Sequence, residues 1–440
     1  MTRRWIAIAV VATAVIGVSD VTGSTAQVTG QSPNALAFAA RTDRSELDRL
    51  IRVQEDQAEV TPTASGLTFL AQMYLQRGRL TGDVRTYQQA AAAADKALTL
   101  APGDHETRTL LAGILYTTHE FAAAREAANA LVTAQPADLG ALAVLGDSQM
   151  ELGNYADAQA SYRQLAAAAP DAAAVLVRQA RLAFIQGGID SARQFAAEAK
   201  DKADESAFAD AGLAFYSVFR GQIELDSGHY ERAAKLYEQA LLESPGYYSA
   251  TAGLARARAA QGRLKDAIVL YEQAIAVVPQ PDFLAALGDL YELTGQPEQA
   301  AVQYDTVEVI ATLAQINKQI YNRQLALYYA DHDVKISDAV RLARTELSVR
   351  HDVYGYDALA WALYKNGSYQ EARDAARSAT AQRTPDARIW YHAGMIDKAL
   401  GDTATAREEL HHALDLSPAF DPLQAPRARA ALDELESQTS

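Results

Sequence analysis

The segment from Leu139 to Pro170 reads LGALAVLGDSQMELGNYADAQASYRQLAAAAP, and its residue pattern is the strongest indication of the fold. With Leu139 counted as position 1, leucine stands at positions 4 and 7, glycine at 8 and 15, and tyrosine at 17 and 24. Alanine stands at position 20 and proline at position 32. In an alanine-rich chain of 440 residues, internal repetition of such a pattern is the first property to test.

The pattern recurs over most of the chain with a period of 34 residues. Four successive unit starts differ by 34 (139 − 105, 173 − 139, 248 − 214 and 387 − 353), one pair differs by 33 (281 − 248) and one by 41 (214 − 173). The units begin near Ala64 and at His105, Leu139, Ala173, Ala214, Tyr248, Pro281, Val353 and Ala387.

Three columns of identical residues make the repeat specific. Position 15 is glycine at Gly78, Gly153, Gly187, Gly228, Gly262, Gly295, Gly367 and Gly401. Position 20 is alanine at Ala90, Ala124, Ala158, Ala192, Ala233, Ala267, Ala300, Ala372 and Ala406. Position 32 is proline at Pro102, Pro136, Pro170, Pro245, Pro279 and Pro418.

Each column has a physical reason. Glycine at position 15 is expected to end a first helix, because a left-handed C-terminal residue is least costly for glycine. Alanine at position 20 and a small residue at position 8 let two helices approach closely. Aromatic residues at positions 17 and 24 are expected to fill the space between adjacent units. Proline at position 32 cannot continue the second helix.

These columns resemble the tetratricopeptide repeat (TPR) family. The resemblance implies an all-α, right-handed superhelical solenoid of about ten stacked antiparallel helix pairs, which binds proteins or peptides. The run from Leu359 to Pro418 is also similar to secreted bacterial TPR proteins of unassigned function.

The spacing predicts how the chain is divided. Residues 64–309 and 351–420 should form TPR units, and residues 310–350 a degenerate helix pair that has lost the glycine column. The first unit has seven extra residues between Gly78 and Ala90, and seven more across Lys200 to Phe219 should lengthen the helices there. Residues 43–63 should form an N-terminal helix, and residues 421–440 a capping helix and tail.

The N-terminus resembles an export signal. Arg3 and Arg4 precede an apolar run from Trp5 to Val18, and small residues follow, so we expect cleavage after Ala26. The apolar run is too short to span a bilayer, although an uncleaved anchor is the alternative. Residues 1–26 are therefore the predicted signal peptide and 27–42 a flexible leader of an exported, periplasmic or secreted protein, with no membrane insertion after cleavage.

Composition and motifs argue against nucleic-acid binding and catalysis. The net charge of −15 does not suit a phosphate-binding surface, and the chain contains no cysteine. His119-Glu120 lacks the second histidine of a metalloprotease motif, since Ala123 takes its place. We considered weak metal sites at His411-His412 and at Asp331-His332-Asp333, but solvated or half-packed side chains are the better interpretation. We therefore expect no enzyme activity, cofactor or metal.

In TPR proteins the first helices line a concave groove, and two patches stand out among the residues that map there. The first is basic, and the second is aromatic with charged neighbours. Arginines and aromatic residues are frequent interface hot spots. The patches comprise Arg178, Arg181 and Arg256, and Tyr354, Asp357, Trp361, Tyr364, Arg388 and Tyr391.

Two alternatives remain open for these patches. The arginines could instead pair with groove carboxylates, and Trp361 and Tyr364 could pack between units. The positions used by chaperone-binding TPR domains do not carry the required residues. The functional hypothesis is an exported, non-catalytic scaffold that binds a protein or peptide in its groove; the alternative is a structural or assembly subunit of a cell-envelope complex that uses its convex face or ends.

Overall fold

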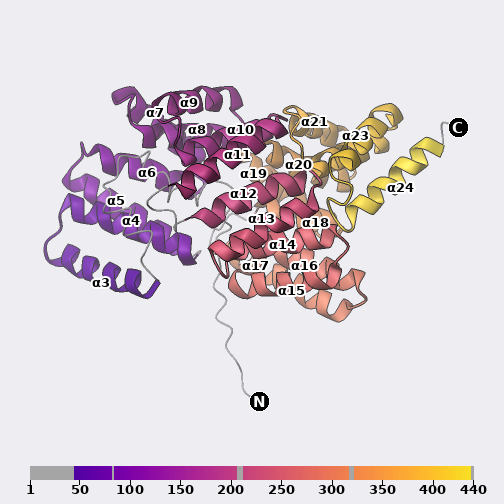
Figure 1. Ribbon diagram of the computed structural model, residues 1–440, viewed down its shortest axis with the longest axis horizontal. Helices are drawn as coiled ribbons and strands as arrows, with labels where there is room; N and C mark the ends of the chain where they lie inside the picture. The colour runs from indigo at the N-terminus through magenta and orange to yellow at the C-terminus, as the bar shows by residue number, and fades with distance from the viewer. Residues whose placement is uncertain (1–43, 82–83, 206–211, 317–321, 438–440) are drawn as a thin grey trace, which may run out of the picture.

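The computed structural model describes residues 44–81, 84–205, 212–316 and 322–437. These residues form helices joined by short turns, and no β-strand occurs among them (Figure 1). The helices are α3 Arg44–Val60, α4 Ala64–Thr81, α5 Val84–Leu100, α6 His105–Thr117, α7 Phe121–Ala134, α8 Leu139–Glu151, α9 Tyr155–Ala168, α10 Ala173–Ile185, α11 Ile189–Asp204, α12 Leu213–Asp226, α13 Tyr230–Glu243, α14 Tyr248–Ala260, α15 Leu264–Val277, α16 Pro281–Leu293, α17 Pro297–Ile316, α18 Asn322–Asp331, α19 Ile336–Val349, α20 Val353–Lys365, α21 Tyr369–Thr380, α22 Ala387–Ala399, α23 Thr403–Leu416 and α24 Gln424–Ser437.

Consecutive helices pack as hairpins, and each hairpin packs on the next. Ten hairpins run from α4/α5 to α22/α23 in the described part of the chain, with α3 before them and α24 after them. The all-α repeat solenoid predicted from the sequence is therefore confirmed. The predicted terminal helices correspond to α3 and α24.

The glycines at position 15 mostly end the first helices, as expected. Seven of them have φ between +71° and +81°, the left-handed region that strains other residues. In the unit that begins at His105, position 15 is His119, which adopts φ +66° despite its side chain. Gly78 is the exception, because it lies inside α4 rather than at its end. A Cβ built on Gly78 would lie 2.6 Å from the ring of Tyr87, so this glycine accommodates a close side chain.

Small residues at position 8 accommodate the tyrosine at position 24 of the same hairpin. A Cβ built on Gly146 would lie 2.5 Å from the ring of Tyr162, and one on Gly288 would lie 2.4 Å from the ring of Tyr304. The predicted packing between units also occurs, since a Cβ built on Gly253 of the next unit would lie 2.3 Å from the ring of Tyr237. The rings of Tyr162 and Tyr304 also close the seam within their own hairpins, where a larger residue at position 8 would overpack.

The two insertions differ from each other. In the first unit the extra residues lengthen both helices instead of forming a loop: α4 has 18 residues and α5 has 17, against 13 and 14 in the next unit. In the second case α11 has 16 residues and α12 has 14, so each helix grows only slightly. The remainder of that insertion falls mainly in residues 206–211, outside the described residues.

The degenerate unit of residues 310–350 keeps the stack continuous. Helices α18 and α19 form its hairpin, which packs between α16 and α20, while α17 extends to Ile316. The turn from α18 to α19 uses Asp333 and Lys335 in the left-handed region instead of glycine. The predicted signal peptide and leader lie outside the described residues. Among the described helices, none combines the length and apolar character that a membrane crossing needs.

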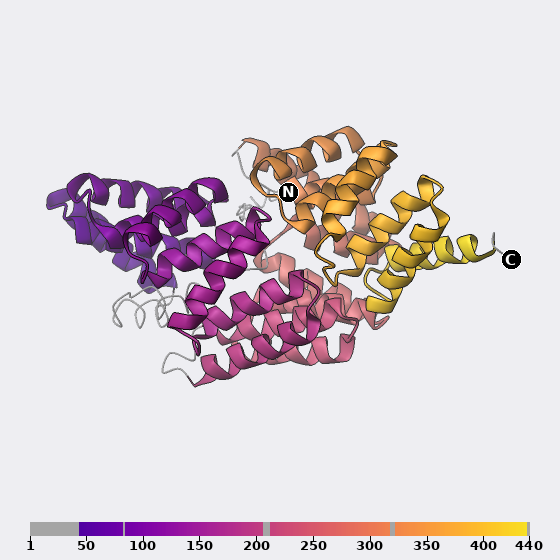
Figure 2. The ribbon, with the colours of Figure 1, turned by 90° about the horizontal axis from the view of Figure 1, so that it is seen from above.

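The solenoid winds back on itself, so that distant units touch (Figures 1 and 2). We call these touching regions the turn junction; they are the ends of α8, α10 and α12 against the turns at residues 350–353, 383–384 and 416–419. The Tyr155 hydroxyl accepts a hydrogen bond from the Val353 amide at 3.0 Å across 198 residues. The Thr384 hydroxyl donates to the Ile185 carbonyl at 2.7 Å across 199 residues.

Glycines at position 15 have a second role in the turn junction. A Cβ built on Gly153 would lie 2.3 Å from the His351 carbonyl oxygen, and one on Gly228 would lie 2.7 Å from that of Leu416. Only residues without a Cβ allow this approach of two backbones. The repeat pattern predicts only that these glycines end helices, because the second requirement depends on contacts between distant units.

Candidate functional site

Arg178, a predicted groove residue, is buried and fully engaged. Its side chain is 2% exposed and forms a two-pronged ion pair with Asp147, with Nη2–Oδ2 and Nε–Oδ1 distances of 2.8 and 2.9 Å. Asp147 also accepts a hydrogen bond from the Tyr162 hydroxyl. Arg178 stands at position 6 of its unit, one step beyond the groove position, and therefore points into the seam. It is not available to a partner.

Arg181 belongs to a second buried ionic cluster. Its Nη2 lies 2.6 Å from Oε1 of Glu151, and Nε of Arg350 lies 2.8 Å from Oε2 of the same carboxylate. Burial by itself would raise the pKa of Glu151, but the two guanidinium groups outweigh it and lower the pKa to about 2. The cluster fastens the turn junction, and the predicted basic patch therefore does not form a free surface.

The predicted aromatic patch is mainly core. Trp361 and Tyr391 are each 1% exposed. The Trp361 indole stacks on His392 with ring centroids 4.1 Å apart and donates its N–H to Asp331 at 2.7 Å. Asp357 is buried as well and bonds to Nδ1 of His392 at 2.8 Å. Trp361 and Tyr391 therefore pack in the core, as the alternative of packing between units predicted for Trp361.

Two aromatic members of the patch keep some exposure. Tyr364 is half-buried and stacks on Trp361 with centroids 4.9 Å apart. Tyr354 is half-buried below the guanidinium of Arg323, which lies 5.6 Å from its ring centroid. Burial, followed by the charges of Asp386 and Asp226, raises the pKa of Tyr354 well above its usual value. Tyr354 therefore interacts electrostatically with Asp386 and Asp226, although it lies in a different helix, α20.

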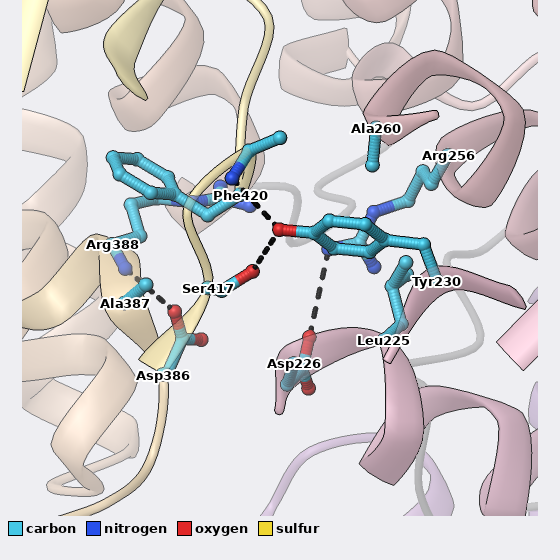
Figure 3. Close-up of a pocket in the computed structure, with 11 residues that line it drawn as sticks. Leu225, Asp226, Tyr230, Arg256, Ala260, Asp386, Ala387, Arg388, Ser417 and Phe420 are labelled. Atoms are coloured by element: carbon cyan, nitrogen blue, oxygen red, sulfur yellow. Dashed lines mark hydrogen bonds and ion pairs between the residues drawn. The ribbon is translucent and has the colours of Figure 1, made fainter. Parts of the chain in front are cut away.

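The other two predicted arginines, Arg256 and Arg388, meet at one cavity in the turn junction (Figure 3). They come from the first helices α14 and α22, which are separated by several units along the chain. The cavity measures about 20 Å³, enough for a small group or water. The residues that line it are Leu225, Asp226, Tyr230, Arg256, Ala260, Asp386, Ala387, Arg388, Ser417, Ala419 and Phe420.

Hydrogen bonds of Tyr230 join the two walls of this junction cavity. Its hydroxyl accepts from the Ala419 amide at 2.7 Å and shares a 2.9 Å bond with the Ser417 hydroxyl (Figure 3). The sequence predicted that position-17 tyrosines such as Tyr230 and Tyr155 fill gaps between adjacent units. The structure adds a second role: their hydroxyls bond to units one superhelical turn away.

The two arginines of the junction cavity differ in their partners. Nη1 of Arg256 donates to Gln222 at 3.2 Å, and its Nη2 lies 3.8 Å from Asp226. The guanidinium of Arg388 makes no hydrogen bond or ion pair within the described residues, although the charges of Asp386 and Asp421 act on it from farther away. Its five N–H donors therefore have no acceptor among the described residues.

Asp226 gives the cavity a titratable group. Burial and then the negative charge of Asp386 raise its pKa to about 7, against the opposing effects of Arg256 and of a hydrogen bond from Gln222. Asp226 and Asp386 were not among the predicted site residues. Nothing in a single unit indicates that they meet, because they belong to helices that only the turn junction brings together.

The weaker metal candidates do not converge. Among the described residues no group of three or more histidine and acidic side chains is placed to hold a metal ion. His411 bonds to Glu436, whereas His412 contacts the Trp390 ring edge-on. His332 bonds to Asp289. The members of both predicted clusters therefore engage different neighbours.

Comparisons with known proteins agree with this architecture. Tetratricopeptide repeat profiles match residues 75–138, 144–207 and 358–419, and a second profile with the same description matches residues 224–290. The chain belongs to the tetratricopeptide repeat family. Repeats of this family form scaffolds for protein–protein interaction and are generally non-catalytic. No match to the sequence of a curated protein was found.

Solved structures similar to this TPR chain share little sequence with it. Human IFIT1, solved as a dimer with PPP-AAAA, is 14% identical, with a TM-score of 0.45 and coverage of 91% of this chain and 95% of that chain. A TPR protein from Parabacteroides merdae is 16% identical, with a TM-score of 0.40 and coverage of 60% and 93%. Cut9 from the Cut9–Hcn1 complex is 14% identical, with a TM-score of 0.34 and coverage of 94% and 98%.

Proposed function

We propose that this TPR protein is an exported, non-catalytic scaffold that binds a protein or peptide on the inner face of its superhelix, beside the junction cavity. The main support for this proposal is that the guanidinium of Arg388 faces this cavity without a partner among the described residues. Arg388 is half-buried, so its guanidinium is partly shielded from water, and an external acceptor would stabilise it. The export signal predicted from the sequence of residues 1–26 favours a location in the periplasm or outside the cell.

The inner face is restricted by the protein's own contacts. Arg178, Arg181, Trp361 and Tyr391 are occupied by the fold, so a partner would use the remaining exposed positions of the first helices. Glu292 in α16 is one such exposed position. The proposed binding region therefore extends from the junction cavity along α14 and α16.

One observation favours the alternative of a structural or assembly subunit. Exposed apolar side chains follow one another on the second helices of three consecutive hairpins. Isolated exposed apolar residues are common, but rows of them mark interaction surfaces. The row comprises Leu242 in α13 (84% exposed), Val269 and Val277 in α15 (50% and 56%), and Val302 and Val309 in α17 (59% and 44%).

Site-specific photo-crosslinking separates the two functions. A photoreactive benzoylphenylalanine placed at Glu292 should crosslink to a partner in cells if the inner face binds, and one at Val302 should not. Crosslinks from Val302 alone would reject inner-face binding in favour of the row of exposed apolar residues on α13, α15 and α17.

The exported location is tested separately. Mass spectrometry of cell fractions should identify Gln27 as the N-terminal residue of the mature protein.

A further inference from the structure

We propose that the junction cavity is a carboxylate-binding site, in which Arg256 and Arg388 hold the two oxygens of one carboxylate from opposite walls. This inference deepens the proposed function, on which it rests, by naming the chemical group that the partner presents. It follows from the partners, size and charge of the cavity.

The two arginines of the cavity differ in how many of their N–H groups already have an acceptor. Arg388 has no acceptor within the described residues, and Arg256 has a hydrogen bond only to the neutral side chain of Gln222. The Arg256–Asp226 separation of 3.8 Å is long for a hydrogen-bonded ion pair. Figure 3 shows Arg388 extending from the α22 wall and Arg256 from the α14 wall. Each guanidinium thus retains N–H groups for an incoming ligand.

The charges of the cavity require a small anion rather than a cation. The two guanidinium groups repel each other, and the positive charge of Arg388 opposes the charging of Arg256. Asp386 already uses Oδ1 to cap α22 by accepting from the Arg388 amide at 2.9 Å. With Asp226 protonated, Arg256 and Arg388 against Asp386 give the lining residues a net charge of +1, while Asp421, Asp331 and Asp357 act on Arg388 from outside the lining. The N-terminal end of α22, which begins at the cavity wall, adds a favourable dipole for an anion.

The volume of the cavity limits which chemical group of a ligand can enter it. A cavity of about 20 Å³ admits a carboxylate head group but not a ring, and the rest of the ligand would remain outside. A planar carboxylate matches the fork of a guanidinium in charge-assisted hydrogen bonds. Both a free peptide C-terminus and an Asp or Glu side chain carry this group, so the experiment must distinguish them.

Proton binding at Asp226 would be coupled to the ligand. Asp226 interacts with Gln222 of its own helix α12, Arg256 of α14, Arg388 of α22 and its cap Asp386, and with the hydroxyls of Tyr237 in α13 and Tyr354 in α20. When Asp226 ionises as the pH rises through its pKa of about 7, a negative charge appears beside the bound carboxylate. Affinity should therefore fall as the pH rises from 6 to 8, and Asp226→Asn should remove most of that dependence.

Ligand-observed NMR with three short peptides tests the site. The peptides are acetyl-Gly-Gly with a free carboxylate, acetyl-Gly-Asp-Gly-amide with only a side-chain carboxylate, and acetyl-Gly-Asn-Gly-amide as the neutral control. Wild-type protein should bind at least one carboxylate peptide and not the neutral control. Binding of the first alone identifies a C-terminal carboxylate, and binding of both identifies the carboxylate group irrespective of source.

Matched variants assign the binding to the cavity. Arg388→Gln and Arg256→Gln should each weaken the dissociation constant by about tenfold or more, since a charge-assisted hydrogen bond contributes roughly 1.5–3 kcal/mol. Arg341→Gln, which removes an exposed arginine of α19, should leave it unchanged. Arg388→Lys keeps the charge and tests the fork if the glutamine variant fails to fold. Equal affinity in wild type and Arg388 variants, or absence of carboxylate binding, would overturn the proposal, whereas the crosslinking result at Glu292 would still decide the proposed function.

Discussion

The carboxylate of Glu151, at the end of α8, lies 2.8 Å from Nε of Arg350, which follows α19. Both side chains are at most 5% exposed, and Arg181 bonds to the other oxygen of the same carboxylate. Arg350 also covers the ring of Phe121, with its guanidinium 4.9 Å from the ring centroid. This contact fastens two superhelical turns and gives the solenoid a long-range core that a simple stack of neighbours would lack.

Replacing Glu151 by Gln should destabilise the protein strongly. The change leaves Arg181 without its counter-charge and Arg350 with Glu346 alone, and breaking a buried ion pair typically costs about 3–5 kcal/mol. The measurement is the free energy of unfolding from urea titration followed by circular dichroism. Asp338→Asn is the matched control: it removes the partner of Arg341 in a pair that is 61% and 48% exposed, and should cost less than about 1 kcal/mol. Similar losses in the two variants would contradict the role of Glu151.

Substitution of Gly153 should cost more than substitution of Gly262, although both have the same position and almost the same backbone. Their φ angles are +71° and +75°, so alanine pays the left-handed penalty of roughly 1–2 kcal/mol at either site. At Gly153 the new Cβ would also meet the His351 carbonyl at 2.3 Å, whereas nothing lies close to Gly262. Thermal unfolding of Gly153→Ala and Gly262→Ala measures the difference. Equal melting temperatures would show that the turn junction does not form in solution.

Trp361→Ala should behave as a core variant. The indole is 1% exposed, stacks on His392 and bonds to Asp331, and truncation of a buried tryptophan costs about 3–5 kcal/mol. Urea unfolding should show this loss, together with increased proteolysis of α20–α24. A variant that kept wild-type stability but lost partner binding would restore the interface role predicted from the sequence.

Stability should decrease as the pH rises from 7 to 8, and Glu409 should be responsible. Burial and the neighbouring Asp397 raise the pKa of Glu409 from 4.5 to about 8. The folded state therefore binds more protons than the unfolded chain between these values, and the free energy of unfolding falls as the pH rises through that window.

Glu409→Gln should flatten this decrease, because glutamine supplies the hydrogen-bond donor without titrating. Urea midpoints at pH 7 and 8 provide the measurement, and Asp226, whose folded-state pKa is about 7, contributes equally to the slope of wild type and variant. Exposed Glu434→Gln, 56% accessible in its pair with Lys398, serves as the control. An unchanged pH slope in Glu409→Gln would refute the assignment.

The sequence by itself determined the repeat. The columns at positions 8, 15, 20 and 32 record constraints inside one hairpin or between neighbours, such as the ring of Tyr162 against Gly146, and a linear period reveals such constraints. Helix boundaries followed to within a few residues, except where insertions entered helices, as in α4 around Gly78. There the helix continued because extra residues can propagate existing helical hydrogen bonds without a new nucleus.

Only the tertiary structure decided which predicted site residues remain accessible. Arg178 pairs with Asp147 in the seam between helices, and Arg181 pairs with Glu151 in the turn junction. Arg256 and Arg388 instead line one cavity. The pitch of the superhelix sets these encounters, and that pitch accumulates from small rotations at every hairpin contact. The sequence of one unit does not reveal the accumulated rotation. The local pattern therefore predicts the units, whereas the contacts between Glu151 and Arg350 or between Tyr230 and Ser417 depend on how all the intervening units pack.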